Sequence, residues 1–126
     1  MRILIETIPH ASQAYPTVGD WRRDSDGTLH IKVSEEIGDK FALLVALHEL
    51  IEVTLCEERG VTCEQVDAFD KEFEAMRKED DDSEPGDHPE APYRREHFFA
   101  TSIERLMAAE MGVDWQAYDG AIMKLP

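Results

Sequence analysis

The sequence lacks several features that mark particular classes of protein. Two cysteines in 126 residues, Cys56 and Cys63, cannot build a disulfide framework, and their spacing is not that of a Cys-x-x-Cys motif. No apolar run approaches the roughly 20 residues that cross a bilayer, and residues 1–6 turn acidic too soon for a secretory signal. There is no internal repeat and no glycine-rich phosphate loop. We therefore expect a reduced, cytoplasmic protein.

The chain also has few basic residues. It holds 13 lysines and arginines against 28 aspartates and glutamates, which gives a formal net charge of −15. Such a protein repels phosphate backbones unless its bases cluster on one face, and these bases do not cluster. Anionic membrane surfaces repel it as well. We therefore expect neither a nucleic-acid partner nor a membrane partner. Three explanations of the surplus carboxylates remain, namely a solvated surface, ligands for a cation, and a mimic of nucleic acid.

The order of the expected elements indicates the fold class. Hydrophobic residues make up 42% of the chain, enough for the core of one domain over residues 1–126. Three β-rich segments come first and cover residues 3–8, 21–23 and 28–33. Helical periodicity follows over residues 41–59, 62–76 and 93–110, and over a short segment after Asp114. This order predicts an α+β domain in which a small antiparallel or mixed sheet packs against three main helices and a short C-terminal helix.

An acidic loop is expected over residues 78–92, where seven of the twelve residues 79–90 are acidic. Its spacing does not match the calcium loop of an EF-hand. A mimic of nucleic acid would need carboxylates spread over a face, whereas a run of charge is usually a solvated loop. We expect this loop, with His88 inside it, to be exposed to solvent.

Three ionisable side chains, His48, Glu49 and Glu52, interrupt the most apolar helix, in which 12 of the 16 residues 41–56 are apolar. Burying a bare carboxylate costs several kcal/mol unless it is paired, protonated or bound to a metal. Residues 48 and 52 lie one helical turn apart on one face, so both side chains can reach a common point, and Glu49 projects from the adjoining flank. The sequence thus predicts either a metal site or a polar cluster paired with arginines.

The metal interpretation follows a known spacing. In His-Glu-x-x-His helices, the residues at i and i+4 bind zinc and the Glu at i+1 is the general base. Here His48 and Glu52 would be the two ligands, and Glu49 would take a proton from a water between them. A carboxylate ligand still suits zinc, the favoured divalent metal, and admits manganese or iron(II).

A third ligand is expected from the helix over residues 93–110. His97 is the first candidate, because an imidazole complements a site that already has a carboxylate. Glu96, nearer the apolar side of that helix, and Glu104, two turns beyond His97, are the alternatives. Glu104 could instead accept a hydrogen bond from His97 or pair with an arginine at the surface.

Four other residues carry weaker signals. Asp67 and Asp70 adjoin the apolar stripe of the second helix, and we expect them to form surface pairs, with added carboxylates at the site as the alternative. Phe98 and Phe99 are expected in the core. For the polar cluster, the arginine partners would be Arg94, Arg95 and Arg105.

Residues 46–52, Ala-Leu-His-Glu-Leu-Ile-Glu, resemble the active-site helix of zincin metallopeptidases, and the preceding strands look like the small sheet beside that helix. The whole chain more closely resembles small proteins of tailed phages and prophages, through residues 15–21, 66–70 and 93–100 as well as this helix. The resemblance to zincins implies a metal-dependent hydrolase acting on an amide-like bond of a peptide or protein. The resemblance to phage proteins implies an origin in a phage or prophage and a place in the bacterial host cytoplasm, but no established activity. The alternative is a non-enzymatic, acidic phage accessory protein that binds a host protein. Either would be a monomer or a homodimer, since the long apolar helix needs cover.

Overall fold

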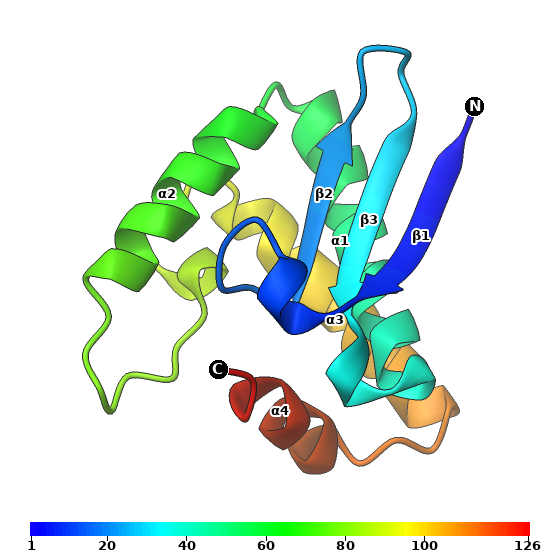
Figure 1. Ribbon diagram of the computed structural model, residues 1–126, viewed down its shortest axis with the longest axis vertical. Helices are drawn as coiled ribbons and strands as arrows, with labels where there is room; N and C mark the ends of the chain where they lie inside the picture. Colours follow the sequence, from blue (N-terminus) through cyan, green and yellow to red (C-terminus); the bar gives the residue numbers. More distant parts are fainter.

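Three strands open the chain and form one mixed sheet. The computed structural model describes residues 1–126 and places β1 (Ile3–Ile8), β2 (Gly19–Arg23) and β3 (Leu29–Ser34) in the order β1-β3-β2 (Figure 1). β2 and β3 form the predicted antiparallel hairpin, whereas β1 runs parallel to β3. Leu29, Ile31 and Val33 of β3 are buried while Lys32 is exposed, as the period of two requires. The strands therefore present one apolar face for a helix to cover.

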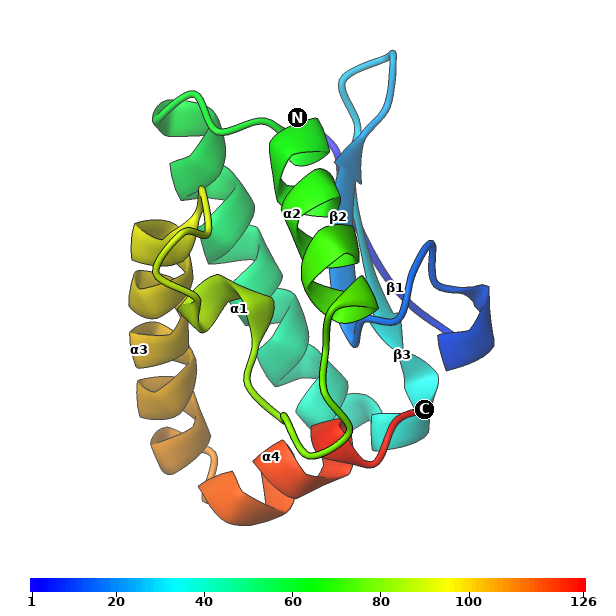
Figure 2. The same cartoon turned by 90° about the vertical axis from the view of Figure 1, so that its left-hand side faces the viewer.

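Helix α1 (Asp39–Glu58) covers that face, and α3 (Arg94–Glu110) crosses α1 on the side away from the sheet (Figure 2). α1 is thus the middle of three layers, which explains why it is apolar nearly all round. Ala100 and Ala108 are fully buried on α3, and their small side chains allow the two helices to approach closely. This sheet, α1 and α3 confirm the predicted α+β fold.

The remaining helices close the sides of the molecule. α2 (Cys63–Ala75) lies beside β2 and begins with the predicted capping box, in which the side chains of Thr62 and Gln65 bond to each other's backbone N–H. α4 (Trp115–Met123) is capped by Asp114. Short 3-10 turns occur at η1 (His10–Ser12), η2 (Glu35–Ile37) and η3 (Pro85–Asp87). None of the helices combines the length and the hydropathy that a membrane crossing requires.

Two expectations about side-chain burial are wrong. Phe98 and Phe99 are 43% and 53% exposed, because α3 is the outermost layer and turns these positions to solvent. Asp67 and Asp70 are buried instead of lying at the surface. Asp67 pairs with Arg22 at 2.7 Å, and two tyrosine hydroxyls donate to Asp70, from Tyr93 at 2.5 Å and Tyr15 at 3.0 Å. The side of α2 that faces Arg22 of β2 and the two tyrosines is therefore more polar than its sequence pattern suggests.

Candidate metal centre

The packing of α3 on α1 brings His48, Glu52 and His97 together. All three are buried, with 8%, 4% and 6% of their surface exposed. His48 Nε2 lies 3.0 Å from Glu52 Oε2, and His97 Nδ1 lies 3.2 Å from the same oxygen atom. The two imidazole rings are 4.9 Å apart, nearly edge to face. One ring nitrogen of each histidine therefore faces a single carboxylate oxygen.

The other ring nitrogen of each histidine also meets a carboxylate. His48 Nδ1 donates to Glu104 Oε1 at 2.7 Å, and the hydroxyl of Tyr118 donates to the second oxygen of Glu104. His97 Nε2 lies 2.9 Å from Glu84 Oε2 and 3.3 Å from Asp87 Oδ1. Glu104 is thus buried beside His48, instead of bonding to His97 or to a surface arginine. His48 therefore lies between two carboxylates and His97 among three, although His97 Nε2 has no hydrogen bond to Glu84 or Asp87.

The acidic loop is not only solvated charge, because part of it covers His97. Gly86, in the turn η3, is buried against the ring, and a Cβ atom at this position would lie 2.4 Å from His97 Cγ. Only glycine allows this approach, which brings Glu84 and Asp87 to the imidazole. His88, which was expected to be exposed to solvent, is half-buried and packs on Phe69 and Phe73 of α2. Sequence spacing gives no link between residues 84 or 87 and residue 97, and the Pro85-Gly86 turn is the one local signal.

Glu49 lies on the flank of the cluster, next to the sheet. Its carboxylate is half-buried and makes no hydrogen bond to protein, and a Cβ at Gly19 of β2 would lie 3.0 Å from Glu49 Oε1. Burial, followed by the negative charge of Glu52, raises the pKa of Glu49 well above its usual range. A carboxylate with a raised pKa and no fixed partner is a candidate proton acceptor and donor.

The charges inside the cluster compensate one another. Burial would raise the pKa of Glu52, but the hydrogen bonds from His48 and His97 outweigh it and lower this pKa to about 2. Burial likewise opposes the charge on His97, yet contacts with Glu52 and Glu84 raise its pKa to about 10. Burial also opposes the charge on His48, but its hydrogen bonds with Glu104 and Glu52 raise the pKa of this residue well above its usual value. Without a metal, the cluster is a buried network of imidazolium and carboxylate groups.

These pKa values predict how the stability of the metal-free protein depends on pH. His97 contributes fully below pH 6.5, its ordinary pKa, and this contribution is lost as the pH rises toward 10. Glu52 contributes above pH 4.5, and its contribution is lost as the pH falls toward 2. Burial raises the pKa of Asp70 to about 7. The contribution of Asp70 to stability is therefore already lost near neutral pH, and it does not change further as the pH rises to 10.

We therefore expect the free energy of unfolding, measured by urea denaturation in the presence of a chelator, to fall between pH 6.5 and 10. The His97→Gln variant should show a flatter decline over this interval. An equally steep decline in that variant would assign the pH dependence to other groups.

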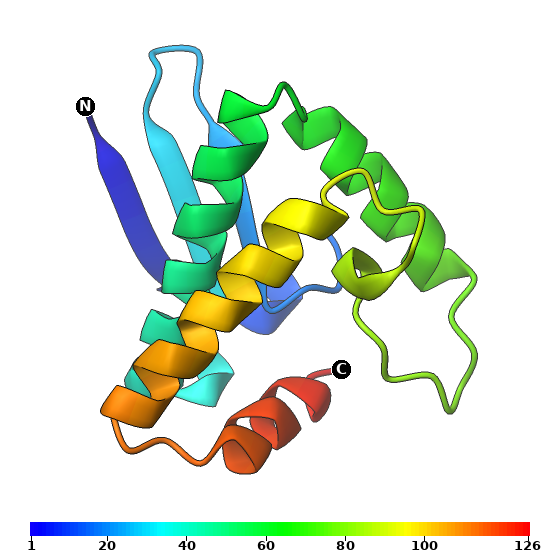
Figure 3. The ribbon, with the colours of Figure 1, turned by 180° about the vertical axis from the view of Figure 1, so that it is seen from behind.

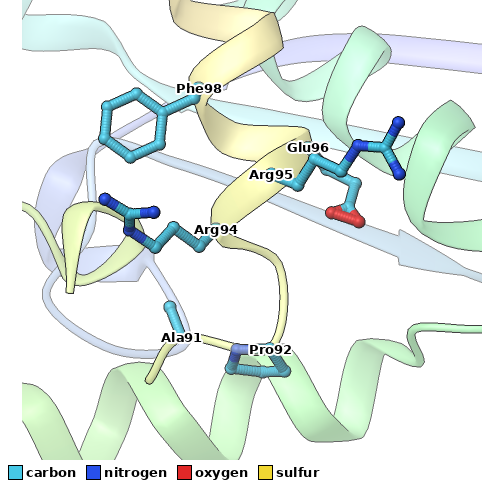
Figure 4. Close-up of a pocket in the computed structure, with 6 residues that line it drawn as sticks. All are labelled: Ala91, Pro92, Arg94, Arg95, Glu96 and Phe98. Carbon is cyan, nitrogen blue, oxygen red and sulfur yellow. The ribbon is translucent and has the colours of Figure 1, made fainter. Parts of the chain in front are cut away.

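The other candidates lie outside the cluster. Glu96 is buried, but it faces Arg59 at 3.6 Å, and its second oxygen has no partner. Arg94, Arg95 and Arg105 make no ion pair with the cluster. Arg105 lies over the ring of Trp115. Residues at the start of α3 instead line an open surface hollow (Figure 4), namely Ala91, Pro92, Arg94, Arg95, Glu96 and Phe98.

The fold and the cluster together define an α+β domain whose buried His and Glu side chains can hold a metal ion. No family model, curated protein or solved structure matches the chain. The chemistry of this site is therefore inferred from its own residues and their geometry.

Proposed function

We propose that the protein is a metal-dependent hydrolase of the zincin type, with His48, Glu52 and His97 as the ligands of a divalent cation. Zinc is the favoured ion, and manganese and iron(II) are the alternatives. One observation carries the proposal: the near nitrogens of both histidines face one oxygen of Glu52. The far nitrogen of His48 is hydrogen-bonded to Glu104, and the far nitrogen of His97 lies 2.9 Å from Glu84. Histidines that bind metals almost always donate their other ring N–H to such a partner, as His48 does to Glu104, and this bond fixes the tautomer and the ring orientation.

The donor set fits a zinc-like ion. The three ligand atoms lie within 4.8 Å of one another. The N···O separations of 3.0 and 3.2 Å are slightly shorter than the edge of a tetrahedron with metal–ligand bonds of about 2.1 Å, which is roughly 3.4 Å. Three protein ligands with a fourth position left open are typical of catalytic zinc sites, whereas structural sites use four.

Glu49 is the proposed catalytic base. A bound divalent cation supplies Lewis-acid polarisation of water and of carbonyl oxygens. The carboxylate of Glu49 accepts the proton of the attacking water and returns it to the leaving nitrogen, for which its raised pKa is suited. Glu104 and Tyr118 hold the ring of His48, while the turn at Gly86 shields His97 from water. The substrate would be an amide-like bond in a peptide or protein.

The resemblance of residues 46–52 to zincin helices supports this reaction class. The wider resemblance supports an origin in a tailed phage or prophage and a place of action in the bacterial cytoplasm. A second candidate function, binding of a host protein without catalysis, is favoured by the exposed side chains on the outer side of α3, which are Phe98, Phe99, Leu106 and Met107.

Metal content separates the two candidates. We expect elemental analysis of purified protein to find one transition metal per chain, and a hundredfold excess of zinc over its Kd to raise Tm by about 10 °C. His48→Ala should abolish both effects. His30→Ala is the matched control, because His30 pairs with Asp24 at the hairpin, away from the cluster. If the wild-type protein contains no metal and neither zinc nor manganese stabilises it, the metal site is wrong and host-protein binding becomes the better hypothesis.

A further inference from the structure

Strand β1 forms an open edge of the sheet. It is hydrogen-bonded only to β3, and no helix lies along its outer side in the front or rear view (Figures 1 and 3). Three consecutive apolar side chains in this strand, Ile3, Leu4 and Ile5, are 36%, 38% and 50% exposed. Proteins usually protect such edges with lysine, proline or a bulge, and β1 has none of these.

The parallel ladder leaves half of the backbone groups of β1 unpaired. The carbonyl of Arg2 accepts from the N–H of Leu29, and residue 3 is the partner of residue 29 in the register. Because the direction of backbone groups alternates along a strand, the N–H and C=O groups of Ile3, Ile5 and Thr7 point away from β3. This outer ladder can bond only to solvent or to another strand.

The sequence of β1 is complementary to itself in the antiparallel direction. With Leu4 at the twofold axis, Ile3 lies opposite Ile5 of the second copy, and Arg2 lies opposite Glu6. Ile3 and Ile5 then exchange backbone hydrogen bonds, while Arg2 and Glu6 form the non-hydrogen-bonded pairs, in which side chains are closest. Of the registers that match the outward-pointing residues, only this one places both arginines opposite glutamates.

We propose that a second copy of this chain docks on β1, giving a homodimer with one continuous six-stranded sheet. Charge favours this edge, since the chain carries −15 overall but residues 1–8 contain one arginine and one glutamate. Two copies can therefore meet here without opposing their acidic surfaces. An antiparallel pair of identical strands also satisfies the closed twofold symmetry of most homodimers. The proposal is independent of the metal site.

Charge reversal tests the interface and its register. Arg2 and Glu6 are exposed and make no ion pair within the chain, so neither Arg2→Glu nor Glu6→Arg should disturb folding. Each variant alone places two pairs of like charges across the twofold axis, and we expect its dimer Kd to rise about tenfold. An equimolar mixture of the two variants pairs every glutamate with an arginine, and should recover dimer at wild-type affinity.

The measurement is sedimentation velocity of the full chain over a range of concentrations at 0.15 M salt, with 14.4 kDa as the mass of the monomer. Glu110→Arg, a reversal at an exposed position on α3, is the matched control and should leave the dimer unchanged.

Ile5→Pro removes only an outward N–H, which a free edge strand tolerates, and should yield a folded monomer by circular dichroism and sedimentation. A wild-type chain that stays monomeric at every concentration overturns the proposal. A dimer whose Kd is unchanged by both charge reversals also overturns the proposal. The interface would then lie elsewhere, and the apolar outer side of α3 would be the next surface to test.

Discussion

Glu49→Gln is expected to lower the rate of metal-dependent hydrolysis by about 10²- to 10⁴-fold, the usual contribution of a general base. The amide keeps the size of the carboxylate but cannot take a proton from water. Metal should remain bound, because Glu49 does not belong to the group of His48, Glu52 and His97. This combination of lost turnover and retained metal distinguishes a base from a ligand.

The assay would use a mixture of fluorogenic peptides of random sequence, with metal content measured on the same samples. Glu58→Gln is the matched control, because Glu58 lies on the same helix and is exposed to solvent. Hydrolysis at the wild-type rate in Glu49→Gln would contradict the role of the base. If the wild-type protein binds metal but cleaves no peptide, the proposed metal site is supported and the proposed hydrolase activity is rejected.

Glu52→Ala is expected to lower the free energy of unfolding of the metal-free protein by about 3–5 kcal/mol, the usual cost of removing one partner from a buried ion pair. The rings of His48 and His97 are 4.9 Å apart, and Glu52 is the acceptor they share. Without it, two buried imidazolium groups would face each other, so the pKa of each should fall toward neutrality. Chemical denaturation at pH 6 in the presence of a chelator measures the loss.

Glu57→Ala provides the comparison on the same helix. Glu57 forms a 2.7 Å ion pair with Arg23, but both side chains are about 40% exposed, so its removal should cost less than about 1 kcal/mol. Equal losses from the two substitutions would show that Glu52 acts as an ordinary surface carboxylate. The loss at Glu52 should shrink as the pH falls from 4.5 toward 2, because the Glu52 carboxylate itself becomes protonated over that interval.

Most of the secondary structure can be predicted from the sequence because its causes are local. The alternation of Leu29, Ile31 and Val33 marks β3. The Asp24-Ser25-Asp26-Gly27 turn predicts the hairpin, and its Gly27 adopts the expected positive φ of 88°. Side-chain caps mark the starts of α2 and α4. These features depend on residues within one turn of each other, so no knowledge of packing is needed.

Part of the candidate site also follows from the sequence. His48 and Glu52 must share a face of α1, because four residues make about one helical turn. Their place in an apolar helix predicts burial, and the structure buries both. The choice among His97, Glu96 and Glu104 could not be made in this way, since all three lie on α3 and are buried.

Only the tertiary structure decided which groups meet. His97 and Glu104 lie seven residues apart on one side of α3, but α3 crosses α1 and so places Glu104 at His48 and His97 at Glu52. The path of the acidic loop brings Glu84 to His97, and it depends on the absence of a side chain at Gly86. Local spacing therefore determined the helices and the first two candidate ligands, whereas the crossing of two helices and the route of one loop determined their partners. Those are properties of packing between segments far apart in the chain, and no spacing along the chain encodes them.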